Sequence, residues 1–128
     1  MKRILCFGDS NTWGYSPVNG TRFPSDIRWT GVLQKTLGAS YRVIEEGLNG
    51  RTTFINEQGE DARPFRSGSD VLPFLLESHR PLDLVTIMLG TNDLKVEFDL
   101  SVEEIAQGAK DLCEMVLNSE YLADNPPQ

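Results

Sequence analysis

The stretch Ile-Leu-Cys-Phe-Gly-Asp-Ser-Asn, residues 4–11, decides the fold that we predict for this chain. Four apolar residues lead directly into a turn, which is typical of a strand buried on both faces. Gly8 permits a sharp exit from that strand, so Ser10 should lie just beyond its carboxyl end. Open α/β sheets bind ligands at such strand ends, and a hydroxyl placed there is a candidate nucleophile. Taken alone, however, Gly-Asp-Ser is equally an ordinary turn tripeptide.

The rest of the chain alternates helices with two more strands. We expect a helix over 27–37 capped by Asp26, a strand over 41–44, a polar loop over 56–69, a helix over 70–79, a strand over 82–89 buried on both faces, and a helix that ends near Leu117. Ser101 and Glu104 form a capping box for this last helix, and Pro126-Pro127 exclude helix in the tail. This order indicates parallel strands with right-handed crossovers. The predicted fold class is α/β: a flavodoxin-like, three-layer α/β/α arrangement with a parallel sheet.

Composition limits the kinds of partner. With 128 residues the chain is long enough for one domain, and its net charge of −7 argues against nucleic acid or an anionic membrane as a partner. The apolar run after Met1-Lys2-Arg3 is too short for a signal peptide, and no stretch is long enough to cross a membrane. We therefore expect a cytoplasmic protein, in which Cys6 and Cys113 are isolated, buried thiols.

Two further motifs follow the second and third predicted strands. Residues 47–53 read Gly-Leu-Asn-Gly-Arg-Thr-Thr, and residues 90–93 read Gly-Thr-Asn-Asp. Together with Gly8-Asp9-Ser10, in this order, they make the chain resemble the GDSL esterases, also called SGNH hydrolases. It is most similar to their small bacterial esterase and acyltransferase branch. The resemblance extends from Lys2 to about Leu117.

The resemblance implies a role for each motif. Ser10 would be the nucleophile of an esterase that hydrolyses small acyl esters or transfers the acyl group to another alcohol. The amides of Ser10 and Gly50 and the side chain of Asn92 would bind the oxyanion. A glycine lets a backbone amide approach a ligand closely, and an asparagine is a neutral donor. No metal or cofactor is implied.

Four more residues complete the candidate site. Asp9, Asn11 and Trp13 flank the nucleophile and are the candidates for contact with substrate, with the loop after Trp13 as one wall of the pocket. The carboxylates of Asp9 and Asp93 are also suited to hold their loops by accepting backbone amides. Taken alone, Gly50 and Asn92 would equally suit turns, and the loop after Trp13 could be a surface connection with its aromatic side chains packed against the core.

The chain departs from the family at the catalytic base. The family has a histidine near the carboxyl terminus with an aspartate three residues before it, whereas the only histidine here is His79, and residue 76 is leucine. His79 precedes the third strand, at the edge of the sheet opposite to Ser10, and we expect it to be a solvent-exposed residue at a helix end. We therefore interpret residues 1–128 as the amino-terminal part of a single hydrolase domain, without the fourth and fifth strands and the Asp-x-x-His motif.

Two other functions remain to be weighed. The chain could be a catalytically inactive fragment that serves as a binding or assembly module. A flavodoxin-like nucleotide binder is disfavoured because no glycine-rich phosphate loop follows the first strand. Whichever function the chain has, the predicted strand order, second-first-third, leaves one edge of residues 84–89 open. An apolar open edge pairs readily with another chain, so we expect a homo-oligomer or completion by a carboxyl-terminal segment.

Overall fold

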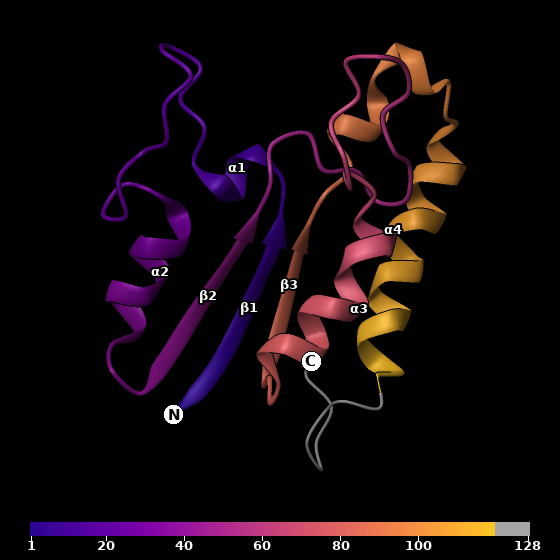
Figure 1. Ribbon diagram of the computed structural model, residues 1–128. Helices are drawn as coiled ribbons and strands as arrows, with labels where there is room; N and C mark the ends of the chain where they lie inside the picture. The colour runs from indigo at the N-terminus through magenta and orange to yellow at the C-terminus, as the bar shows by residue number, and fades with distance from the viewer. Residues whose placement is uncertain (120–128) are drawn as a thin grey trace.

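The computed structural model describes residues 1–119, and the expected non-helical tail at Pro126-Pro127 lies outside them. Three parallel strands form the sheet in the order β2-β1-β3: β1 is Lys2–Gly8, β2 is Tyr41–Gly47 and β3 is Leu84–Met88 (Figure 1). In this register Gly8 lies opposite Gly47 on one side and Met88 on the other. All three strands therefore end at the same edge, and the predicted order and parallel direction are confirmed.

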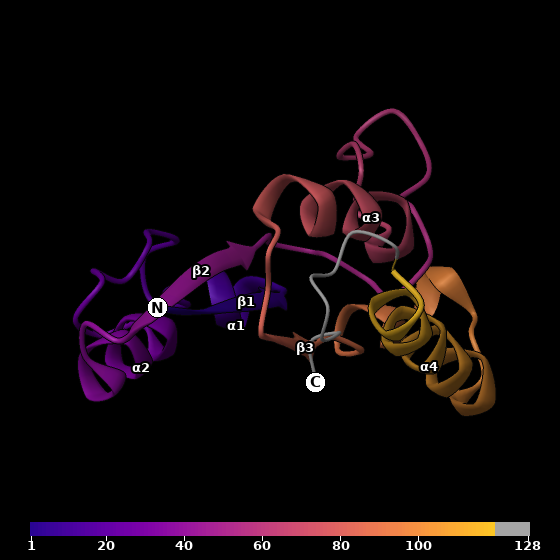
Figure 2. The ribbon, with the colours of Figure 1, turned by 90° about the horizontal axis from the view of Figure 1, so that it is seen from below.

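Helices cover both faces of this sheet. They are α1 (Ser10–Trp13), α2 (Trp29–Leu37), α3 (Gly68–His79) and α4 (Val102–Leu117), with 3-10 turns η1 (Asn92–Leu94) and η2 (Val96–Phe98) before α4. Seen along the sheet, α2 and α3 lie on opposite sides of it, and α4 lies beside α3 (Figure 2). The expected three-layer α/β/α fold is confirmed.

The core lies between the sheet and the α3–α4 pair. Its buried side chains come from β1, β2, both helices and the segment before β3: Leu5, Phe7, Ile44, Leu72, Leu76, Leu82, Leu112 and Val116. Because successive side chains of a strand point to opposite faces, Leu5 and Phe7 enter this core while Ile4 and Cys6 face the α2 side. The continuous apolar run that predicted a strand buried on both faces is thus explained, and residues 4–8 are all buried.

The prediction that the third strand is also buried on both faces is wrong. β3 is shorter than expected, and its residues are only partly buried, with Met88 42% exposed. Within residues 1–119, β1 is the only strand that pairs with β3. The outer edge of β3 therefore carries no strand in the described part of the chain.

Several element boundaries also differ from expectation. α2 begins at Trp29, because the amides of Ile27 and Arg28 bond to the Pro24 carbonyl in a preceding turn, and Asp26 does not cap the helix. β2 continues to Gly47, three residues beyond the predicted end. α3 begins at Gly68, two residues early, which places Pro73 inside the helix.

The capping box at the start of α4 is confirmed. Ser101 Oγ accepts the Glu104 amide at 3.1 Å, and Glu104 Oε2 accepts the Ser101 amide at 2.7 Å. Cys6 is a buried free thiol as expected, whereas Cys113 is exposed, because it lies on the solvent side of α4. No helix within residues 1–119 is long and apolar enough to cross a membrane.

Candidate active site

Ser10 is the first residue of α1, directly after β1. The preceding Asp9 is the N-cap of this short helix, and its Oδ1 accepts the Asn11 amide at 2.9 Å. Asp9 is 2% exposed, whereas Ser10 is half-buried and Asn11 is exposed. The turn therefore buries the carboxylate and leaves the serine accessible.

Close contact with the strand ends fixes the position of α1. A Cβ at Gly8 would overlap Thr12 Oγ1, and a Cβ at Gly47 would overlap the Trp13 amide nitrogen. Both glycines are needed because the helix sits directly on the ends of β1 and β2. Trp29 is half-buried, and its Nε1 donates to Thr12 Oγ1 at 3.3 Å, which ties α2 to α1.

The turn after β2 brings Gly50 to the same edge. The Leu48 amide donates to the Gly8 carbonyl at 3.2 Å, and the Arg51 amide donates to the Leu48 carbonyl at 3.1 Å. Gly50 has a φ of +80°, a conformation that favours glycine. Within residues 1–119, the amides of Ser10 and Gly50 donate to no protein acceptor. Two backbone donors are therefore free at the strand ends.

Asn92 reaches this turn from the end of β3. Its Nδ2 donates to the Arg51 carbonyl at 3.0 Å, which uses one of the two amide protons. The structure thus brings the segments of all three motifs to one edge of the sheet. Asn92 has a structural bond there and retains one proton for a ligand.

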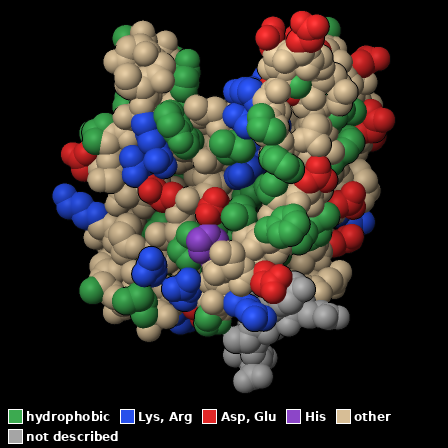
Figure 3. Space-filling view, viewed as in Figure 1, with side chains coloured by type: hydrophobic (Ala, Val, Ile, Leu, Met, Phe, Trp, Pro, Cys, Tyr) green, Lys and Arg blue, Asp and Glu red, His purple; other side chains and the backbone are tan. Residues whose placement is uncertain are grey.

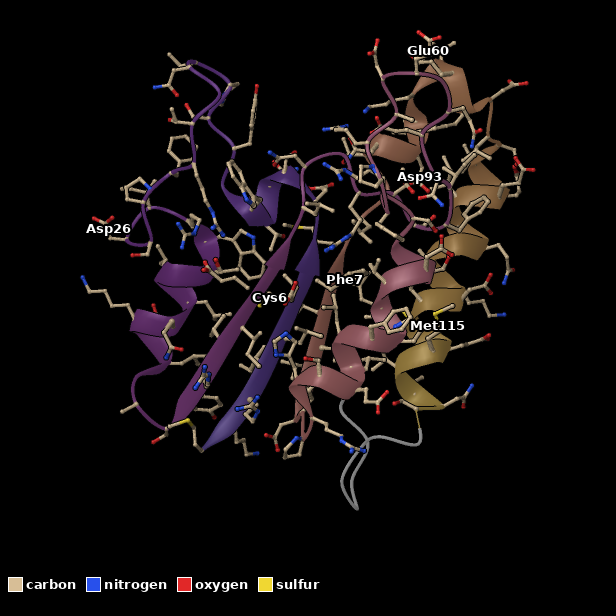
Figure 4. The ribbon with its side chains drawn as sticks, viewed as in Figure 1. Cys6, Phe7, Asp26, Glu60, Asp93 and Met115 are labelled. Carbon is tan, nitrogen blue, oxygen red and sulfur yellow. The ribbon has the colours of Figure 1, made fainter. Side chains whose placement is uncertain are left out.

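The carboxylate of Asp93 stabilises the loop that follows Gly50. Asp93 is fully buried, and its two oxygens accept the Thr53 amide at 3.0 and 3.1 Å, while Oδ2 also accepts the Thr53 hydroxyl. Figure 4 shows Asp93 inside the fold near the upper end of α4, whereas Asp26 and Glu60 point outward. The prediction that Asp9 and Asp93 accept backbone amides is confirmed.

Sequence reasoning gave no role to Arg51, which is 5% exposed. Its Nη1 donates to the carbonyls of Gly8 at 3.2 Å and Glu46 at 2.5 Å, and its guanidinium lies 4.3 Å from the centroid of the Phe7 ring. Burial lowers the pKa of Arg51 to about 10. Arg51 therefore joins the ends of β1 and β2, while its own carbonyl holds Asn92. Its place within the Gly-rich motif was the only signal in the sequence.

Trp13 is held by the loop that follows it. Arg22 Nε donates to the Trp13 carbonyl at 2.6 Å, and the Arg22 guanidinium lies 5.1 Å from the centroid of the Trp13 ring. Glu45 pairs with Arg28 at 2.9 Å and with Arg22 at 4.0 Å. The loop and the start of α2 are thus fastened to β2, beside α1.

His79 has a different environment from the one expected. It does end α3, and Arg3, near the amino end of β1, donates Nη2 to its carbonyl at 2.9 Å. Its ring is only partly solvent-exposed, because the side chain is 27% exposed and Nε2 lies 2.8 Å from Glu46 Oε1. Within residues 1–119, no hydrogen bond joins His79 to Ser10. The imidazole is instead part of a contact between α3 and β2.

Comparison with known proteins identifies the family. Residues 6–123 match the GDSL-like Lipase/Acylhydrolase family, and the chain belongs to this family. No match was found among curated proteins.

Solved structures of similar proteins share the fold. An aryl esterase from M. smegmatis, solved with an inhibitor bound, is 50% identical, with a TM-score of 0.88 over 93% of this chain and 56% of that one. A carbohydrate acetylesterase family member from Sinorhizobium meliloti is 40% identical, with a TM-score of 0.92 over 100% of this chain and 60% of that one. The present chain thus spans less than two thirds of the length of these structures.

Proposed function

We propose that this chain carries the nucleophile and the oxyanion site of a carboxylic ester hydrolase. Family membership supports the reaction class, and the solved relatives include an aryl esterase and a carbohydrate acetylesterase. The observation that carries the proposal is the set of free donors at the strand ends. The amides of Ser10 and Gly50 have no acceptor within residues 1–119, and Asn92 retains one amide proton.

In this proposal the Ser10 hydroxyl attacks the ester carbonyl, and the negative charge that develops on the carbonyl oxygen is bound by the three donors. Such donors act because they are already oriented before the charge forms. The contacts of Asp9, Asp93 and Arg51 supply that orientation. Asn11 and Trp13 flank Ser10 and are the proposed contacts for the rest of the substrate.

A base must accept the proton of the Ser10 hydroxyl, and the His79 imidazole cannot do so because it is paired with Glu46. We therefore expect residues 1–128 alone to hydrolyse p-nitrophenyl acetate slowly, about 1,000- to 10,000-fold faster than water does. Because this residual rate comes from the oxyanion site, Asn92→Ala should lower it by about 100-fold or more, whereas Ser10→Ala should prevent formation of an acyl-enzyme. His79→Ala is the matched control and should leave the rate unchanged.

The proposal fails if Asn92→Ala leaves the rate unchanged, or if Ser10→Ala still forms an acyl-enzyme. Under the alternative, a non-catalytic binding or assembly module, no variant would change ester hydrolysis at all. A loss of rate in His79→Ala would instead show that this histidine takes part in proton transfer.

A further inference from the structure

Three arginines surround the turn that carries Gly50. Arg66 Nε donates to the Asn49 carbonyl at 2.9 Å, and Arg51 donates to the adjoining strand ends. The Arg63 guanidinium lies against Gly50 so closely that a Cβ there would overlap Nη2. Gly50 is therefore favoured by its positive φ, and the Arg63 guanidinium lies in contact with it. Figure 3 shows basic side chains beside the hollow between the two upper lobes of this face.

Among the residues that the structure describes, only one of these three guanidinium groups is bonded to a carboxylate. Arg63 pairs with Glu57 at 2.7 Å, whereas Arg66 donates to the carbonyls of Asn49 and Pro64. Arg51 has carbonyl partners and the Phe7 ring. Burial, with the nearby charge of Arg63, lowers the pKa of Arg66. The cluster thus carries positive charge that its bonded partners do not neutralise.

The two outer arginines also have donors to spare. Within residues 1–119, neither Arg63 Nη1 nor Arg66 Nη2 has a protein acceptor. Planar guanidinium groups bind carboxylate and phosphate oxygens through paired hydrogen bonds, and such charge-assisted bonds are the stronger ones. An anion held here would also reduce the repulsion between the neighbouring cations.

The neighbouring surface restricts where such an anion can lie. Glu57 also lines a groove between this loop and residues 95–98, together with Gln58, Asp61, Ala62, Lys95, Glu97 and Phe98. Three carboxylates in this groove repel an anion. The favourable position is therefore on the Gly50 side of Arg63, next to the free amide of the candidate oxyanion site.

We propose that Arg63 and Arg66 bind an anionic group of the substrate, namely a carboxylate or phosphate that the ester carries in addition to the bond that is cleaved. The substrate class is then acidic esters and not neutral ones. This assignment rests on the proposed function, because it takes Gly50 as part of the oxyanion site.

The test compares an anionic with a neutral ester. For p-nitrophenyl hemisuccinate, Arg63→Gln and Arg66→Gln should each lower kcat/KM by about 10- to 100-fold, the value of a charge-assisted hydrogen bond. For p-nitrophenyl acetate each substitution should cost less than for the hemisuccinate, and the ratio of the two kcat/KM values isolates the anionic group, because any disturbance of the Gly50 turn lowers both. Raising the salt concentration should weaken the preference of the unmodified protein for the hemisuccinate.

Arg3→Gln is the matched control. Arg3 also donates Nε and Nη2 to one backbone carbonyl, that of His79, but at the opposite edge of the sheet. The Arg3→Gln substitution removes the same charge and should leave the ratio of the two kcat/KM values unchanged. Melting temperatures of all three variants separate a loss of binding from a loss of folded protein.

A binding measurement that needs no turnover separates this proposal from the proposed function. Monomethyl succinate should shift the NMR signals of the Gly50 amide and the Arg63 Nε–H saturably, whereas dimethyl succinate should not. If neither ester is hydrolysed but these shifts occur and the Gly50 amide shift vanishes in Arg63→Gln, the anion site stands and the hydrolase function fails. Equal responses to both esters in all variants, in rate and in NMR shifts, would overturn the anion site.

Discussion

Strands β1 and β3 have similar apolar sequences but different environments. Residues 4–8 of β1 are buried, with a strand on each side, whereas β3 has one strand neighbour within residues 1–119 and leaves Met88 42% exposed. Both strands nevertheless deliver a motif to the same edge, Ser10 from β1 and Asn92 from β3. The comparison shows that an apolar sequence indicates that a strand can be buried. Whether it is buried depends on which strands and helices pack against it.

The largest effect expected from this difference concerns assembly. We propose that the open edge of β3 is covered in the working protein by another copy of the chain or by further polypeptide. A flat apolar edge pairs readily with other chains. Size-exclusion chromatography with light scattering on protein of verified mass should therefore give a species larger than 14.3 kDa. A stable soluble monomer of that mass would contradict the proposal.

A pair of substitutions, one in each strand, measures the difference in burial between β1 and β3 as a free energy of unfolding. Leu5→Ala in β1 removes a fully buried side chain and should lower the free energy of unfolding by about 2–5 kcal/mol. Met88→Ala in β3 should cost about 1 kcal/mol or less, because this side chain is already partly in water. Urea unfolding of both variants gives the two values. Equal costs would mean that the edge of β3 is buried in solution.

The loop beneath the site depends on one buried carboxylate. Asp93→Ala leaves the Thr53 amide and hydroxyl without their acceptor, and it should cost about 2–3 kcal/mol. The exposed Asp61→Ala is the control, with an expected change within about 0.5 kcal/mol. Urea unfolding measures both, and a small cost for Asp93→Ala would show that water replaces the carboxylate.

The ion pairs on the α2 side should give a smaller, acid-dependent effect. The hydrogen bond from Arg28, together with that from Thr30, lowers the pKa of Glu45 below its usual value of 4.5. Its stabilisation is therefore complete above pH 4.5 and is lost as the pH falls through the lowered pKa. We expect Glu45→Gln to cost about 1 kcal/mol at pH 7 and nothing near pH 2. Urea unfolding at the two pH values tests this, and an equal cost at both would exclude the ionised pair as the cause.

Much of the fold could be predicted because its signals are local. The apolar run of β1, the glycines at the strand ends and the capping box at Ser101 each specify a conformation within a few residues. The partial exposure of β3, the pairing of His79 with Glu46 and the role of Arg51 could not be predicted in this way. They depend on which segments meet in space, and Arg51 contacts Gly8, which lies 43 residues away.

The candidate site also combines residues that the sequence predicts with contacts that it does not. Ser10, Gly50 and Asn92 were selected because their motifs follow strands in a particular order, and strand topology brings those motifs to one edge. The contacts that hold these motifs in place join segments far apart in the sequence, such as the bond from the Thr53 amide to Asp93, 40 residues away. Arg63 and Arg66 lie in a loop without helical or strand periodicity, and nothing in the sequence placed them beside Gly50.

The measurement that tests the central claim most directly is a structure of the protein after prolonged reaction with a small fluorophosphonate. We predict phosphorus bound to Ser10 Oγ, with one phosphoryl oxygen about 2.7–3.1 Å from the amide nitrogens of Ser10 and Gly50 and from Asn92 Nδ2. Phosphonate on another residue, or a phosphoryl oxygen directed away from Gly50 and Asn92, would contradict the claim.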